Sequence, residues 1–172
     1  MLSLQSRKDK GLLSRLEIIL LDQEEETMIK EYLELKLAFM KEYNNNNNNN
    51  ENISVESIKQ FYGMFLEPYI FIAKIDLERE EKYVGFIEGK KLTFDTYWSS
   101  GVYVLPNYRS LGIAKKLKEK QIEHAKKTRC ETIETLVSEE NFKSMLLQIS
   151  SGFEFSEYNP RMKEFKVVRR IY

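Results

Sequence analysis

The clearest structural signal in the sequence is the segment Val102-Tyr-Val-Leu-Pro-Asn-Tyr-Arg-Ser-Leu-Gly-Ile-Ala114. Its first residues are typical of a β-strand, and Pro106 ends that strand because proline has no backbone N–H to donate to a ladder. Gly112 and Ala114 follow, where the helical pattern of the next residues begins. The stretch therefore predicts a strand that leads through a short turn into a helix.

Such a turn has the chemistry of an anion site. The small residues Gly112 and Ala114 let a ligand approach the backbone closely. The first turn of a helix carries N–H groups without partners, and the helix dipole favours negative charge there. Arg109 and the pair Lys115 and Lys116 add positive charge around it. We therefore expect this turn to bind a pyrophosphate.

The residues after the turn predict the second half of a sheet. Gly112 to Thr128 is a helix, and Thr132 to Val137 is a short apolar strand. Asn141 to Ser150 is predicted to be a short amphipathic helix. Two alternating strands, Phe153 to Tyr158 and Lys163 to Ile171, complete the chain. The apolar positions of the short helix are Phe142, Met145, Leu146 and Ile149.

The residues before the turn predict the first half. Leu16 to Leu21 is a β-branched apolar run typical of a buried strand, and a helix from Glu24 to Tyr43 follows it. A second helix begins at Ser54 and ends before Pro68. The next three strands are Tyr69 to Asp76, Lys82 to Glu88 and Thr96 to Val104. The order β-α-α-β-β-β-α-β-α-β-β predicts an α/β fold with a mixed central sheet flanked by helices.

The chain of 172 residues fits a single domain. We expect residues 16–172 to form it, and residues 1–15 to be a flexible tail without the apolar run of a secretory signal. Seven consecutive asparagines, Asn44 to Asn50, offer nothing apolar to bury. Residues 44–52 are therefore predicted to be a flexible loop.

Composition narrows the function classes. Lysine plus arginine number 27, as do aspartate plus glutamate, so there is no electrostatic case for nucleic acid or an anionic membrane as partner. Cys130 is the only cysteine, which excludes an internal disulfide, and no apolar run could span a bilayer. No His/Cys/Asp spacing predicts a metal site. We expect a cytoplasmic protein.

The segment Arg109-Ser-Leu-Gly-Ile-Ala114 resembles the Arg/Gln-x-x-Gly-x-Gly/Ala signature of the GNAT acetyltransferase family. A second pattern of that family, Asn-x-x-Ala-x-x-Leu-Tyr-x-x-x-Gly-Phe, is similar in its spacing to the segment from Asn141 to Phe153. The order of the elements before and after also fits the family. The resemblance covers nearly the whole chain from Leu16 to Tyr172.

The resemblance implies a function and a cofactor site. It implies an N-acetyltransferase that uses acetyl-CoA as co-substrate, without a metal, on a primary amine of a small molecule or a peptide. The strand backbone at Val102, Tyr103 and Val104 would hold the pantetheine arm, with Asn141 nearby. The acceptor would lie between the early helices and the last strands. The turn would cradle the pyrophosphate through Arg109, Ser110, Leu111, Gly112, Ile113, Ala114 and Lys115.

The catalytic groups are not evident. Gln148 stands where the family often has a tyrosine that protonates the leaving thiolate, and an amide is a poor proton donor. Strand alternation places Trp98, Ser100 and Val102 on one face, with no carboxylate among them. Three carboxylates nearby in sequence are left without a role: Glu88, Asp95 and Glu134.

Other residues have plainer interpretations. His124, late in its helix and without a partner in the pattern, is interpreted as a packing or capping residue, and Cys130 as a structural one. The lysines from Lys115 to Lys127 are interpreted as mostly a solvated face. No Ser-His or Cys-His pair suggests a covalent nucleophile, so we expect direct attack by the amine. The alternative function is a non-catalytic acyl-CoA-binding or interaction module, and either would be a monomer or a homodimer.

Overall fold

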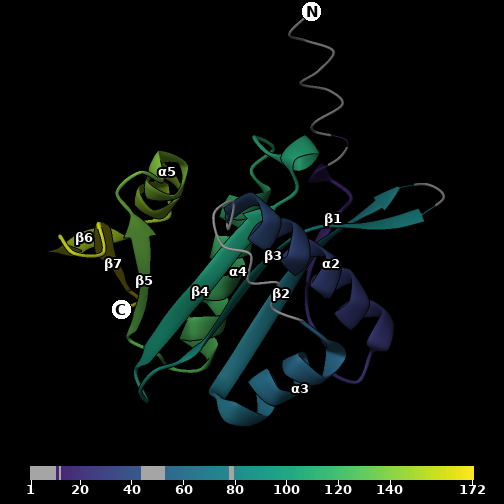
Figure 1. Ribbon diagram of the computed structural model, residues 1–172, viewed down its shortest axis with the longest axis horizontal. Coiled ribbons are helices and arrows are strands. Elements are labelled where there is room, and N and C mark those ends of the chain that lie inside the picture. The colour runs from purple at the N-terminus through teal and green to yellow at the C-terminus, as the bar shows by residue number, and fades with distance from the viewer. Residues whose placement is uncertain (1–10, 12, 44–52, 78–79) are drawn as a thin grey trace, which may run out of the picture.

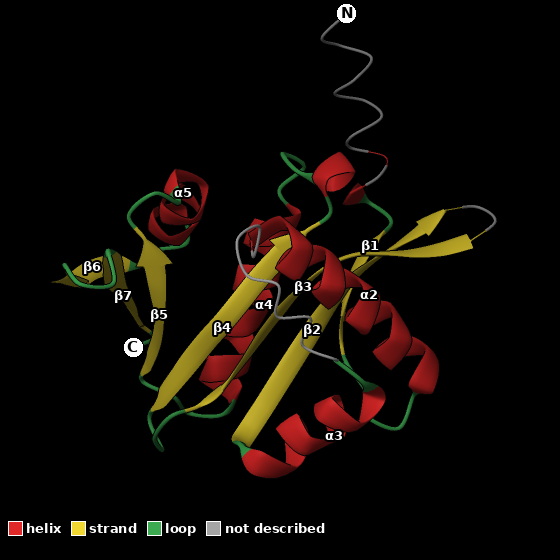
Figure 2. Cartoon of the chain, viewed as in Figure 1, coloured by secondary structure: helices red, strands yellow, loops and turns green. Residues whose placement is uncertain are grey.

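The computed structural model of the chain describes residues 11, 13–43, 53–77 and 80–172. The asparagine tract and most of the predicted tail lie outside this part. The predicted order of elements is confirmed, and with it the mixed α/β fold class (Figure 2). The elements are β1 (Leu16–Leu20), α2 (Glu26–Tyr43), α3 (Val55–Met64), β2 (Leu66–Leu77), β3 (Glu80–Lys91), β4 (Thr96–Val104), a 3₁₀ turn (Pro106–Tyr108), α4 (Ile113–Lys127), β5 (Thr132–Ser138), α5 (Phe142–Ser150), β6 (Glu154–Asn159) and β7 (Glu164–Arg170).

The strands form one seven-stranded sheet in the order β1-β2-β3-β4-β5-β7-β6. Neighbours are antiparallel except β4 and β5, which are parallel. Helices α2 and α3 cover one face of the sheet, and α4 covers the other (Figure 1). The parallel pair requires a crossover connection between its strands, and α4 supplies it.

Two apolar cores lie on the two faces of the sheet. Strand β2 contributes to both because its side chains alternate: Ile70 and Ile72 face α2, whereas Phe71 and Ala73 face α4. This double burial explains why β2 is a continuous apolar run in the sequence.

Helix α2 packs one apolar face against the sheet. Met28, Tyr32 and Leu35 of α2 are buried against the sheet. Phe39, one turn further on, is partly buried and packs edge to face against Phe86 and Tyr103. The C-terminal turn of α2 is thereby held over β4.

The prediction of α5 as a helix is confirmed, but only one of its four predicted apolar positions, Met145, packs against the core. Phe142, Leu146 and Ile149 are 70%, 68% and 54% exposed, whereas Gln148 is only 3% exposed. The reason is that α5 stands beyond the end of β5 rather than over the middle of the sheet (Figure 1). Its inward face consists of Ser144, Leu147 and Gln148, which line a cavity.

Candidate active site

The sheet divides between β4 and β5. Only three residue pairs join them, Thr96–Trp98 with Thr132–Glu134, although β4 continues to Val104 and β5 to Ser138. Beyond these pairs the strands diverge, and a cavity of about 700 Å³ lies between them. The cavity is lined by residues of α2, β4, α4, β5, α5 and β7 and by the turn before α4. The edge of β4 from Ser99 to Val104 therefore adjoins this cavity rather than a neighbouring strand.

A β-bulge in β4 corrects the predicted alternation. The pairing with β3 shifts between Glu88↔Gly101 and Gly89↔Ser99, so that Ser100 is the extra residue. Side chains change face across a bulge. As a result Tyr97 shares the α4 face with Val102 and Val104, and the predicted common face of Trp98, Ser100 and Val102 is wrong.

Across the bulge, the sheet brings a buried carboxylate to the cavity wall. Glu88 is 7% exposed and accepts hydrogen bonds from Tyr32 Oη and Lys36 Nζ, both on α2. It pairs with Gly101, and a Cβ on that glycine would lie 3.5 Å from Glu88 Oε1. Because Gly101 lines the cavity and has no side chain, little separates the carboxylate from it. Burial and the nearby Glu88 raise the pKa of Tyr32, which stays a donor.

The turn before α4 forms the outer end of the cavity. Ser110 and Gly112 both adopt left-handed backbone conformations, with φ of 64° and 81°. Gly112 is the N-cap of α4 and supplies no side-chain cap, so the first-turn N–H groups are left for other partners. A Cβ at Gly112 would meet no atom within 4 Å, so the space in front of this turn is open. Successive N–H groups in such a turn make an anion-binding concavity.

Arg109 is fixed at this outer end by three hydrogen bonds. Its Nε donates to the Val104 carbonyl at 2.8 Å, and its two terminal nitrogens donate to the Glu42 carboxylate at 2.8 and 2.5 Å. The hydrogen bond from Arg109 lowers the pKa of Glu42. The guanidinium also lies 5.4 Å from the ring centre of Tyr103. The last turn of α2 is thereby tied to the turn before α4.

The cavity brings together most of the residues that the sequence singled out. Leu111 and Ile113 instead turn their side chains into the apolar core, Gly112 lies at the open end, and Lys115 is exposed. The predicted residues that line the cavity are Val102, Tyr103, Val104, Arg109, Ser110, Ala114 and Asn141.

One residue at the inner end of the cavity was missed by the sequence analysis. Lys118, predicted as part of a solvated lysine face, is fully buried and lines the cavity. Gln148, which the sequence had singled out, is buried and lines the same cavity, and its Oε1 has no hydrogen-bond partner among the described residues. The helical spacing of Ala114 and Lys118, four residues apart on one face, was the signal that could have identified the lysine.

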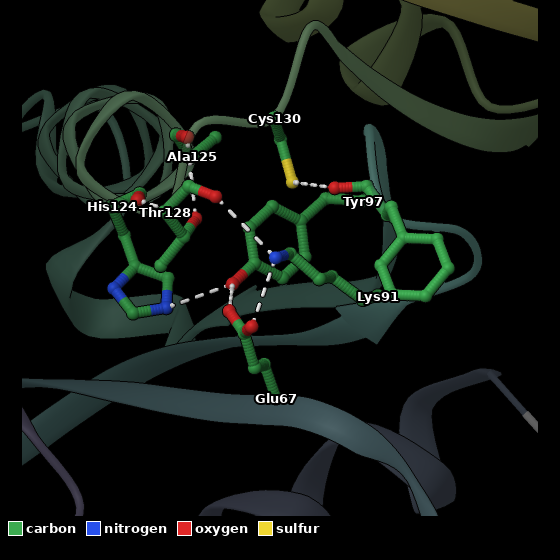
Figure 3. A network of polar contacts seen from close by, with 8 residues as sticks. Glu67, Lys91, Tyr97, His124, Ala125, Thr128 and Cys130 are labelled. Carbon is green, nitrogen blue, oxygen red and sulfur yellow. Dashed lines mark hydrogen bonds and ion pairs between the residues drawn. The ribbon is translucent and has the colours of Figure 1, made fainter.

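A second polar cluster lies outside the cavity, near the start of β4 (Figure 3). Lys91 donates to Glu67 at 2.9 Å and to the Thr128 carbonyl at 3.3 Å, and Tyr97 Oη lies 3.3 Å from His124 Nε2. His124 contacts the rings of Tyr69, Phe71 and Tyr97, which confirms its packing role. Burial lowers the pKa of His124. Cys130 is buried near the same cluster, in the apolar core.

No group of three or more His, Cys, Asp or Glu side chains in the described part of the chain could hold a metal ion. No helix in the same residues is long and apolar enough to cross a membrane.

Known structures share this fold. The chain superimposes on a GNAT acetyltransferase from Staphylococcus aureus Mu50 with a TM-score of 0.71 and 19% identity, covering 91% of this chain and 99% of that one. YncA from Salmonella typhimurium, in complex with acetyl-CoA, gives a TM-score of 0.71 and 14% identity over 92% and 95% of the two chains. The PaiA N-acetyltransferase of Thermoplasma acidophilum, in complex with coenzyme A, gives 0.66 and 16% over 90% and 98%.

Sequence comparison assigns the family. No curated protein sequence matches the chain. The model of the acetyltransferase (GNAT) family, however, matches residues 33–148, which include α4 and the divergent part of β4. The chain therefore belongs to the GNAT acetyltransferase family and is an acyltransferase.

Proposed function

We propose that the protein transfers an acetyl group from acetyl-CoA to a primary amine by direct attack. One observation carries the proposal: the unpaired edge of β4 leads from the uncapped N-terminus of α4 to the buried inner end of the cavity. A chain-like ligand with a phosphate group at one end and amides along its length fits this path. Acetyl-CoA has these features, and YncA and PaiA have structures with acetyl-CoA and coenzyme A respectively.

Several of the chain's own groups suit this co-substrate. The open turn at Ser110 and Gly112 would hold the pyrophosphate, and the backbone of Val102 to Val104 would hydrogen-bond the pantetheine amides. The unpartnered Gln148 Oε1 is an acceptor that a pantetheine N–H would satisfy. A buried acceptor without a partner costs free energy, so such a ligand bond would be favourable.

The acceptor amine would enter from the α2 side. A primary alkyl amine has a pKa of about 10.4 and arrives protonated, so it must lose a proton before it attacks. Glu88, behind Gly101, is the buried carboxylate that adjoins this part of the wall. It can attract the ammonium group, although Lys36 already neutralises part of its charge.

Release of CoA from acetyl-CoA, measured across a panel of small amines and peptides, tests the proposed function. We expect turnover with at least one primary amine and a sequential kinetic pattern. Cys130→Ala should keep its activity, because Cys130 lies in the apolar core and does not line the cavity. Ping-pong kinetics, or an acetylated protein trapped without acceptor, would contradict direct attack. Tight acetyl-CoA binding without any turnover would favour the non-catalytic module.

Arg109→Ala should weaken acetyl-CoA binding only modestly, by about tenfold or 1.4 kcal/mol. Backbone N–H groups supply most of the proposed cradle, and Glu42 already occupies the guanidinium. Glu42→Gln should act in the opposite direction and tighten binding, because it leaves Arg109 with an uncompensated charge. Isothermal titration calorimetry of the three proteins measures both effects. Weaker binding by Glu42→Gln would show that the ion pair supports the site instead of competing for it.

A further inference from the structure

Lys118 is a buried lysine, and no carboxylate of the described residues pairs with it. It is 0% exposed, and its Nζ lies 3.1 Å from Ser99 Oγ and 3.1 Å from Gln121 Oε1. The same nitrogen is 4.7 Å from the ring centre of Phe153. In the described part of the chain no ion pair reaches it. An ammonium carries three N–H groups, so two are used by these acceptors and one is left.

The position of Lys118 is at the inner end of the cavity. Ser99 is the first residue of β4 after the last pair with β5, and Thr135 Oγ1 donates to its carbonyl at 2.8 Å. This contact closes the divergent strands at their narrow end. Lys118 follows Ala114 by one helical turn, about 6 Å along the axis of α4. The helix therefore places Ala114 near the outer end and Lys118 near the inner end of one cavity.

Burial of a lysine at this place needs an explanation. Removing an ammonium group from water is costly unless a counter-ion compensates for it. The neighbours of Lys118 on α4 are the core residues Ile113, Leu117 and Ile122, so an apolar residue would suit the site. A buried ionisable group that lines a cavity is a candidate for chemistry.

The proposed reaction leaves a thiolate at the inner end of the cavity, and Gln148 is unable to protonate it. Its amide can accept a hydrogen bond through Oε1, but an amide N–H is too weakly acidic to protonate a leaving group. Gln148 and Lys118 line the same cavity. Lys118 is thus an ionisable side chain at the end of the cavity where the proposed acyl group would lie.

We propose that Lys118 is a catalytic residue whose third N–H meets the sulfur of the leaving thiolate and gives it a proton. This inference rests on the proposed acetyl transfer. As the acceptor nitrogen bonds to the acyl carbon, the carbon–sulfur bond breaks and its electron pair goes to sulfur. Lys118 Nζ donates one proton to that sulfur and becomes a neutral amine. It regains a proton from water through the open cavity, while the acceptor nitrogen releases one.

The acidity of Lys118 suits this role. Burial lowers the pKa of Lys118 to about 7, below the value of about 8.5 for an ordinary thiol, so proton transfer to a thiolate is favourable.

The groups that face Lys118 are Ser99 from β4, Gln121 from α4 and Phe153 from the segment before β6. Tyr69 of β2 joins through Gln121, and burial keeps it protonated by raising its pKa. The other charged residues that line the cavity are Glu42, Arg109, Lys143 and Glu164.

The first experiment measures the thiol of bound CoA and needs no turnover. The thiolate absorbance of the CoA complex is followed against pH for the parent, Lys118→Met and, as control, Lys126→Met, an exposed lysine in the last turn of α4. Lys118 is already neutral at the pH where an ordinary thiol ionises, so the parent, the control and Lys118→Met should give nearly the same thiol titration. Lys118→Arg keeps a permanent charge beside the sulfur and should lower the pKa of the bound thiol by about one unit.

An unshifted thiol titration in Lys118→Arg would overturn the proposal, because residue 118 would then not adjoin the sulfur. If CoA does not bind to the parent at all, the proposed function fails instead, so the two failures are distinguishable.

The second experiment uses the pH profile of kcat. The parent should lose activity above about pH 7 to 8 as Lys118 becomes neutral, and this alkaline limb should vanish in Lys118→Met. The kcat of Lys118→Met should fall by about 100-fold with little change in KM for acetyl-CoA. Lys118→Arg should show the same loss of kcat, because a guanidinium does not release its proton. An unchanged alkaline limb in Lys118→Met would contradict a role in proton donation.

Discussion

Ala114→Glu is expected to abolish acetyl-CoA binding, with a loss of at least about 100-fold in affinity. Ala114 is in the first turn of α4 and lines the cavity next to the open turn at Gly112. A glutamate there would place a carboxylate against the proposed pyrophosphate and would also fill its space. Both effects oppose binding, since like charges at close range repel strongly where water is partly excluded.

The loss should not come from unfolding. A glutamate in the first turn of a helix interacts favourably with the helix dipole, so thermal stability should be kept or slightly increased. Ala114→Gln separates size from charge and should lose less affinity than Ala114→Glu. Ala114→Gly should bind acetyl-CoA nearly as well as the parent. If calorimetry gives the same affinity for Ala114→Glu and the parent, the turn is not the pyrophosphate site.

Gly89→Ala is expected to destabilise the fold severely, by about 3 kcal/mol or more, with a fall in melting temperature of roughly 10 °C. Gly89 faces Ser99 at the β-bulge, where β3 and β4 approach closely. A Cβ at this position would collide with the Trp98 carbonyl and lie 2.6 Å from Tyr69 Cζ. The carbonyl belongs to the strand backbone, so the strain could be relieved only by moving β4.

Gly63→Ala is the matched control. Gly63 lies within α3, and a Cβ there meets no atom within 4 Å. Alanine in a helix is favoured over glycine by about 0.5–1 kcal/mol, so this substitution should stabilise the protein. Thermal and denaturant unfolding of the two variants should therefore change in opposite directions. Equal stability of Gly89→Ala and the parent would show that β4 can shift at the bulge without cost.

Local sequence patterns predicted the order of the elements and the turn from Pro106 to Ala114. These features depend on neighbours in the chain: proline ends a ladder, and a glycine stands at the start of a helix. The assignment of Val102 to Val104 and of the turn to acetyl-CoA remains a prediction.

Features that depend on distant contacts could not be predicted in this way. The bulge at Ser100 exists because β3 and β4 pair out of register, and Glu88 meets Gly101 only through that pairing. The orientation of α5 depends on how far β5 extends from the sheet, so three of its four predicted apolar positions are exposed and only Met145 packs against the core. Lys118 was assigned to a solvated face because lysine is usually exposed, a rule that fails where a cavity adjoins a helix.

The three residue pairs between β4 and β5 join two halves of the sheet. One half contains β1 to β4 and the other contains β5, β7 and β6, and the chain passes between the halves once, through α4. The apolar core under α4 contains Ile87 from the first half and Ile133 from the second, so this helix packs against both halves. The angle between the two halves of the sheet is therefore set by the side-chain volume beneath one helix. A larger residue at the buried Ala125 would push the two halves apart, and it would change the width of the cavity without lining it.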